Sequence, residues 1–222
     1  MSAFAAQRAE ICRVGRSLFE RGYVHATAGN ISVRLPDGHG FLITPTDACL
    51  GFLEPAQLSH VDIEGHAVGG ERASKTLALH RRIYAAEPLA NCIVHTHSTH
   101  AVALTFETPA SDDDALPPIT PYFVMKVGHV PLIPYHRPGA PEAAEKVAQA
   151  IERFGAAGTP LRAVMLERLG PNVWHETPAA AMAVLEELEE TARLQLLTGA
   201  ARPAPLDASQ IDELRTTFGA RW

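Results

Sequence analysis

Cysteine is scarce in this sequence, and the few cysteines are not paired. Cys12, Cys49 and Cys92 are the only three, and no two of them form a Cys-x-x-Cys motif. An odd number at wide spacing argues against a disulfide framework. The missing Cys-x-x-Cys motif argues against a thiolate metal site. We therefore expect three small, buried or half-buried side chains.

Long apolar segments are missing as well. No stretch approaches the roughly 20 consecutive apolar residues that a membrane-spanning helix needs. The first 22 residues, MSAFAAQRAEICRVGRSLFERG, carry charges throughout and lack the apolar block of a secretion signal. We therefore expect a cytoplasmic protein with no membrane partner.

The chain also lacks an excess of positive charge. It has 19 Lys and Arg against 25 Asp and Glu, which gives a net charge of −6, and no basic run occurs. Because nucleic-acid binding depends on clustered positive charge, this composition disfavours a nucleic-acid partner. A small local basic pocket for an anion remains compatible with it.

The composition that is present predicts one ordinary globular domain. The chain has 222 residues, of which 46% are hydrophobic and 20% are charged. Helical and strand patterns alternate without strict βαβ repetition, so the sequence predicts an α/β domain of the α+β type, covering 1–200, followed by a tail, 201–222, with a short helix. Expected helices cover 2–21, 75–86 (with Ser74 as N-cap), 100–106, 141–154, 178–197 and 211–218; expected strands lie in 26–46, 60–68, 91–99, 122–135 and 162–176.

The segment His95-Thr96-His97 is the clearest chemical signal. On a strand, side chains two residues apart point to the same face, so both imidazoles are placed to bind one metal ion. The alternative is that one histidine faces water and the other is hydrogen-bonded in the core. A catalytic zinc usually has three protein ligands, and the candidates for the third are His129, His136 and His175.

Three short segments have the residues of an anion site. Gly29 permits close backbone approach and Asn30 offers an amide, while Thr46 ends a strand with a hydroxyl. Ser74 and Lys75 lie at a predicted helix start, where free N–H groups favour a phosphate or carboxylate. Each signal alone is weak, but three of them beside a His-x-His strand predict a phosphorylated substrate.

Four motifs in this order, TAGNISVR, FLITPTD, ASKTLALHRRIY and VHTHST, resemble the class II aldolase/adducin family over about residues 3–197. The resemblance implies a single-domain fold with a central mixed or antiparallel sheet flanked by helices. The segments PTDACLGFLEPAQLS, LPPITPYFVMKVG and LIPYHRPGAPE resemble one branch of it, the 3-oxo-tetronate 4-phosphate decarboxylases.

The resemblance implies specific roles for the candidate residues. His95 and His97 are expected to hold zinc or another divalent metal, and a homotetramer is expected. Asn30, Thr46, Ser74 and Lys75 are expected near the substrate phosphate or carboxylate. Two positions depart from the family pattern: Thr76 replaces a glutamate that serves as ligand or acid/base, and Leu169 replaces the third metal-binding histidine. Two outcomes follow: either His129 or His136 completes the metal site, or the metal is weakly bound or absent.

The expected reaction is metal-dependent loss of carbon dioxide from a 3-oxo-tetronate 4-phosphate, which leaves dihydroxyacetone phosphate or a similar ketose phosphate. Lys75 and Thr76 are the expected catalytic residues, with Lys75, or a water ordered by Tyr122 or Tyr135, supplying the final proton. The alternatives are a sugar-phosphate aldolase of the fuculose-phosphate type and a non-catalytic, adducin-like assembly module.

Overall fold

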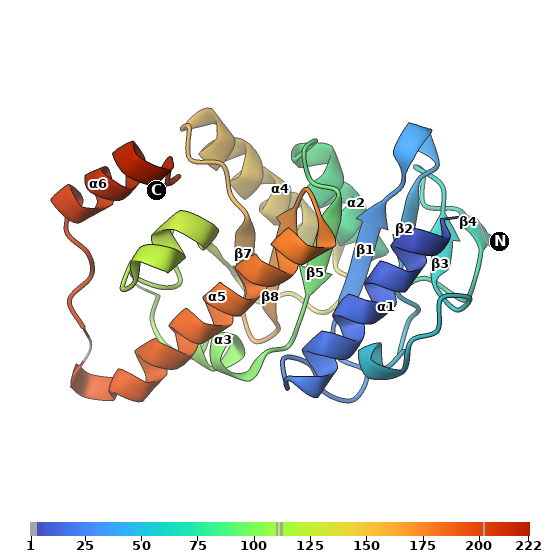
Figure 1. Ribbon diagram of the computed structural model, residues 1–222, viewed down its shortest axis with the longest axis horizontal. Coiled ribbons are helices and arrows are strands. Elements are labelled where there is room, and N and C mark those ends of the chain that lie inside the picture. The colour runs from blue at the N-terminus through green and yellow to red at the C-terminus, as the bar shows by residue number, and fades with distance from the viewer. Residues whose placement is uncertain (1–3, 110, 112, 202) are drawn as a thin grey trace.

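The chain folds around one eight-stranded sheet in the computed structural model, which describes residues 4–109, 111, 113–201 and 203–222 (Figure 1). The strand order is β4-β3-β2-β1-β5-β8-β7-β6. Neighbouring strands are antiparallel except for β6 and β7, which are parallel. The strands are β1 (Asn30–Arg34), β2 (Phe41–Ile43), β3 (Ser59–Val61), β4 (Ala67–Gly69), β5 (Cys92–His95), β6 (Leu132–Ile133), β7 (Ala163–Leu166) and β8 (Gly170–His175).

Helices cover both faces of this sheet. The helices α1, α3 and α5 pack on one face, and α2 and α4 pack on the other (Figure 1). No helix in the described part of the chain is long and apolar enough to cross a membrane. The helices are α1 (Ala5–Glu20), α2 (Leu77–Ala86), α3 (Thr99–Leu104), α4 (Pro141–Ala156), α5 (Pro178–Thr198) and α6 (Ala208–Phe218), with a π-helix at Phe123–Val127 and short 3-10 turns at Pro36–Gly38, Leu50–Phe52 and Gly199–Ala201.

The alternation of side chains along β5 decides on which face of the sheet His95 lies. Cys92 and Val94 point into the core under α1 and α5, whereas Ile93 packs in the core under α2 and α4. Because side chains alternate along a strand, His95 shares the face of Ile93.

The strand order and pairing, with helices on both faces, confirm the expected α+β architecture with a mostly antiparallel sheet flanked by helices.

Two local predictions were wrong. Ser74 is not the N-cap of α2, since that position is Thr76. The chain stays extended before it, because Ala73 bridges Pro45 and the Ser74 N–H donates to the Thr44 carbonyl at 3.2 Å.

The segment 122–135, expected as strand, turn and strand, begins with the π-helix instead. There the Phe123 N–H donates to Thr120 Oγ1 at 3.1 Å, and Phe123, Val124 and Val127 form one buried helical face. Apolar residues at i, i+1 and i+4 fit a helix as well as a strand, so pattern alone could not separate the two.

The division of the chain into a domain, 1–200, and a tail, 201–222, stays a prediction.

Candidate active site

The candidate residues gather where the central strands of the sheet begin or end. Asn30 begins β1 and pairs with His95, the last residue of β5; His95 in turn pairs with Asn172 near the start of β8. Residues in register across antiparallel strands share a face. Asn30, His95 and Asn172 therefore form a row across the centre of the sheet, toward α2 and α4.

The ring of His95 is held with one nitrogen free. His95 is only 2% exposed, and its Nδ1–H donates to the Pro171 carbonyl at 2.8 Å. The Asn172 side-chain amide also lies 3.2 Å from Nδ1. A proton fixed on Nδ1 leaves the lone pair on Nε2, which is the arrangement of a metal-binding histidine.

His97 lies directly beyond the strand, since β5 ends at His95. The two rings are nevertheless adjacent, with centroids 4.9 Å apart and planes at 65°. Burial lowers the pKa of His97, and the charge of nearby His25 lowers it further. Burial likewise lowers the pKa of His95 to about 3, so both rings are neutral and able to act as ligands at neutral pH.

Several buried polar atoms around this pair have no hydrogen-bond partner among the described residues. They are Asn30 Oδ1, Asn172 Oδ1, Thr96 Oγ1 and Ser98 Oγ. A buried polar group without a partner is unfavourable, so such a group marks a place for water, a ligand or a metal with its own ligands. Of these atoms, the Asn30 and Asn172 oxygens lie on the face of His95. Together with two neutral imidazoles, they fit a bound ion with its own water ligands at the end of β5.

The third metal ligand is not fixed by the geometry. A pocket beside His95 lies between α2, β6 and the β7–β8 turn, and His136 lines it too. The His136 Nδ1–H donates to the Pro134 carbonyl at 2.6 Å, which leaves Nε2 free. The His129 Nδ1–H instead donates to the Asp114 carboxylate at 3.0 Å, and the ring stacks on Trp222. In the described part of the chain, no third His, Cys, Asp or Glu ligand atom completes a group of three with His95 and His97 within 4.8 Å.

His175 and Leu169 occupy different ends of the β7–β8 hairpin region. His175 pairs with Cys92, at the far end of β5 from His95. Leu169 lines the pocket beside His95, so an apolar side chain stands where the family resemblance implies a histidine.

The expected anion-binding residues lie on the β1–β2 side of His95. Gly29 adopts a φ of +83°, and a Cβ there would meet the His95 carbonyl at 2.8 Å, so the loop before β1 packs tightly on β5. Thr46 and Ser74 belong to two adjacent extended segments. Lys75 is exposed and its Nζ lies 3.3 Å from Asp47. The structure thus brings Gly29 and Asn30 next to His95, and it places Thr46, Ser74 and Lys75 in a neighbouring pair of segments.

Thr76 lies in the pocket itself, together with His95. Its hydroxyl is 3.0 Å from Ser74 Oγ. Thr76 is therefore hydrogen-bonded to one of the expected anion-binding residues and lines the same pocket as His95.

Two residues near the site were missed by sequence reasoning. Glu167 lines the pocket, and its Oε2 accepts a hydrogen bond from the Tyr135 N–H at 2.8 Å. His25 lies close enough to His97 to affect its pKa. One sequence signal could have found Glu167, because it stands only two residues before Leu169. His25 had no such signal, because it belongs to a loop whose approach to β5 depends on the tertiary fold.

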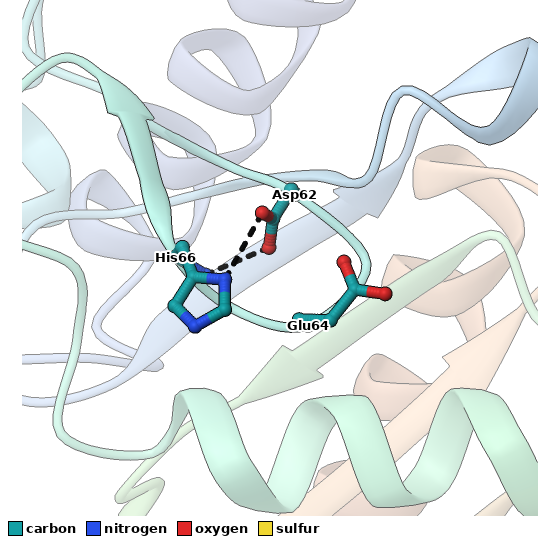
Figure 2. Close-up of side chains that lie close together, drawn as sticks. All are labelled: Asp62, Glu64 and His66. Atoms are coloured by element: carbon teal, nitrogen blue, oxygen red, sulfur yellow. Dashed lines mark hydrogen bonds and ion pairs between the residues drawn. The ribbon is translucent and has the colours of Figure 1, made fainter.

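A second group of possible metal ligands lies on the surface, between β3 and β4 (Figure 2). Ligand atoms of Asp62, Glu64 and His66 lie within 4.8 Å of one another. The Asp62 carboxylate accepts the His66 N–H at 2.8 Å and lies 3.2 Å from His66 Nδ1, so it already stabilises the turn. Exposed acidic turns of this kind are common without an ion, and we assign it no function.

Behind His95, His80 on α2 belongs to a buried polar chain. His80 Nδ1 lies 2.7 Å from Ser32 Oγ, which in turn lies 2.8 Å from the Tyr84 hydroxyl. His80 is fully buried, and burial, followed by the charge of His95, lowers its pKa to about 3. The protein therefore folds with His80 and His95 both neutral.

These two depressed pKa values predict acid sensitivity in chelator-treated protein. Between pH 6.5 and about 3 the unfolded chain binds protons at His80 and His95 that the folded chain does not. The free energy of unfolding is therefore highest above pH 6.5. It falls as pH decreases below 6.5, by up to about 1.4 kcal/mol per pH unit for each group. Urea unfolding as a function of pH measures the slope. His80→Gln should make it shallower, and an unchanged slope would contradict the assignment.

Comparison with known proteins gives the class. The family model of the class II aldolase and adducin N-terminal domain matches residues 9–196. The chain belongs to this family.

Curated relatives and solved structures agree with that membership. A 3-oxo-tetronate 4-phosphate decarboxylase of Cupriavidus necator is 52% identical over the full length of both chains. An L-fuculose phosphate aldolase of Methanococcus maripaludis is 31% identical and covers 85% of this chain and 95% of its own. The crystal structure of YgbL from Escherichia coli, described as an aldolase, epimerase or decarboxylase, has a TM-score of 0.87 at 38% identity, covering 95% of this chain and 98% of its own.

Proposed function

We propose that this protein removes carbon dioxide from a 3-oxo-tetronate 4-phosphate and leaves dihydroxyacetone phosphate. The chain is a lyase of the class II aldolase family, and similarity over its full length to a decarboxylase of that substrate supports the reaction. The structural observation that carries the proposal is His95, buried at the centre of the sheet with Nε2 free beside His97.

The reaction breaks the bond between C1 and C2 of the sugar acid. The electron pair of that bond moves into a C2–C3 double bond, and the ketone oxygen on C3 becomes the oxyanion of an enediolate. Protonation of C2 then gives dihydroxyacetone phosphate. A divalent metal, for which we propose zinc, supplies Lewis-acid stabilisation of that negative charge when it is bound.

The protein's own residues have separable roles in this proposal. His95 and His97 hold the metal, with His136 as the favoured third ligand because it lines the same pocket. Gly29, Asn30, Thr46, Ser74 and Lys75 bind the phosphate on the β1–β2 side. Thr76 orients the substrate from within the pocket. The proton for C2 comes from water on the solvent side of the pocket, where Glu167 lies half-buried.

An aldolase activity is the second candidate, supported by the fuculose phosphate aldolase relative. An aldolase breaks the bond between the carbon next to the ketone and the hydroxyl-bearing carbon beyond it. It therefore releases an aldehyde, not carbon dioxide. The adducin-like assembly module is less well supported, since a scaffold has no use for two adjacent neutral imidazoles next to unpartnered buried polar atoms. A homotetramer and a cytoplasmic location stay proposals.

Product analysis tests the proposal. Purified metal-loaded protein with 3-oxo-tetronate 4-phosphate should release carbon dioxide and dihydroxyacetone phosphate in equal amounts above the spontaneous rate. The same protein with fuculose 1-phosphate should give no aldehyde. Aldehyde formation without carbon dioxide release would replace the decarboxylase with the aldolase.

Lys75→Ala should weaken substrate binding with little effect on metal binding. Lys75 is exposed and lies beside the exposed carboxylate of Asp47, so its ammonium group is available to the phosphate. Loss of one charge-assisted hydrogen bond should raise KM by about tenfold. Lys126→Ala, which removes an exposed lysine outside the pocket, is the matched control. Equal KM values for the two variants would remove Lys75 from the phosphate site.

A further inference from the structure

The pocket beside His95 has one wall made of apolar side chains. Leu79 of α2, Ile133 of β6, Leu166 of β7 and Leu169 of the β7–β8 turn line it together with His95. We call these four residues the apolar wall. Ile133 and Leu166 are only 5% and 7% exposed, and Leu79 and Leu169 are half-buried. None of these four side chains can donate a hydrogen bond to a carboxylate.

Charged residues of the pocket lie toward solvent. Arg137 is exposed, and Glu167 and His136 are half-buried. The Glu167 carboxylate already accepts the Tyr135 N–H and lies 3.5 Å from Arg168. The buried members of the lining are Ile133, Ala140, Leu166 and His95, so the most buried part of the lining is apolar except for His95.

The sheet order indicates which end of the substrate meets the apolar wall. β5, with His95, lies between β1 and β8. The expected phosphate-binding residues lie at the ends of β1 and β2 and before α2, on one side of β5. Three residues of the apolar wall come from β6, β7 and the β7–β8 turn, on the other side.

A 3-oxo-tetronate 4-phosphate carries its phosphate on C4 and its carboxylate on C1, at opposite ends of a four-carbon chain. With the phosphate on the β1–β2 side and the C3 ketone at the histidine pair, the carboxylate points toward β8, β7 and β6. Resting on the proposed function, we propose that the apolar wall determines reaction type by holding the C1 carboxylate poorly hydrated.

The physical reason lies in how charge moves during the reaction. The carboxylate carries a full charge before the C1–C2 bond breaks, and that charge spreads onto C3 oxygen as neutral carbon dioxide forms. An apolar environment destabilises the concentrated charge more than the dispersed one. The wall therefore weakens ground-state binding of the carboxylate and lowers the barrier to its loss, while an aldolase substrate without this carboxylate gains nothing from it.

Leu169→Asn tests the inference, because it offers the carboxylate an amide hydrogen bond. We expect kcat for carbon dioxide release to fall by about tenfold, with KM unchanged or lower, which is the signature of lost ground-state destabilisation. Leu197→Asn, which makes the same change at an exposed leucine of α5 outside the pocket, is the control and should stay within about twofold of the wild type.

A binding measurement separates this effect from catalysis. Tetronate 4-phosphate keeps the carboxylate and the phosphate but has a hydroxyl in place of the ketone, so it cannot lose carbon dioxide. By calorimetry it should bind Leu169→Asn about tenfold more tightly than the wild type. Where Leu169→Asn does not fold, Leu79→Gln on α2 makes the same change on a helix that tolerates Gln.

Each alternative has its own outcome. A lower kcat in Leu169→Asn with no gain in analogue affinity would mean that the wall only shapes the pocket, and would overturn the inference. A large rise in KM in Arg137→Ala would place the carboxylate at the pocket mouth and also overturn it. If the wild type itself releases no carbon dioxide, the proposed function fails, and the analogue measurement shows separately whether the wall faces a carboxylate.

Discussion

His95→Ala should reduce carbon dioxide release by at least roughly a thousandfold, because a bound metal contributes several kcal/mol of charge stabilisation and each 1.4 kcal/mol is a factor of about ten. The same change should abolish tight zinc binding in a calorimetric titration. His95 is buried at the end of β5, and the Pro171 carbonyl fixes its ring with Nε2 free. Removal leaves His97 without its neighbouring ligand.

His66→Ala is the matched control for that experiment. His66 belongs to the exposed cluster with Asp62 and Glu64, the other place where ligand atoms gather in the described part of the chain (Figure 2). We expect this variant to keep both activity and zinc affinity. The reverse pattern, with His66→Ala inactive and His95→Ala active, would move the metal to the surface turn and refute the site described above.

Gly170→Ala should separate the two histidines without touching either ring. Gly170 has a φ of +112°, and a Cβ there would lie 2.3 Å from the Thr96 carbonyl and 3.4 Å from His97 Cα. The backbone between the two ligands must move to accommodate it. Displacement of a ligand by about 1 Å typically lowers activity by about a hundredfold, and we expect a loss of that order in kcat together with weaker zinc binding.

Gly158→Ala controls for backbone strain alone. Gly158 also has a positive φ, of +82°, but an added Cβ there would meet nothing within 4 Å. It should lose about 1 kcal/mol of stability and keep full zinc affinity. Equal loss of zinc affinity in both glycine variants would show that Gly170 acts through global stability and not through the position of His97.

The layers of the fold were predicted well from sequence, because they depend on local pattern. The apolar spacing of Ile11, Val14 and Leu18 predicts α1, and all three are fully buried. The turn residues between β1 and β2 predict that hairpin. Repeated periodicity of this kind is read within a few residues, so no tertiary information is needed.

The candidate site was predicted in part. The spacing of His95 and His97 placed the two rings together, even though His97 lies past the end of the strand. Glu167 and His25 were missed because their approach to the histidine pair is set by contacts between distant segments. The start of α2 was misplaced for the same reason, since pairing with the segment after β2 holds Ser74 extended.

Anomalous diffraction from crystals of zinc-loaded protein tests most directly whether His95 and His97 hold the metal. We predict one strong peak about 2.0–2.1 Å from His95 Nε2, with His97 as a second ligand. The same map identifies the third ligand. A peak only at Asp62, Glu64 and His66, or no peak in protein that releases carbon dioxide at full rate, would contradict a catalytic metal at the histidine pair.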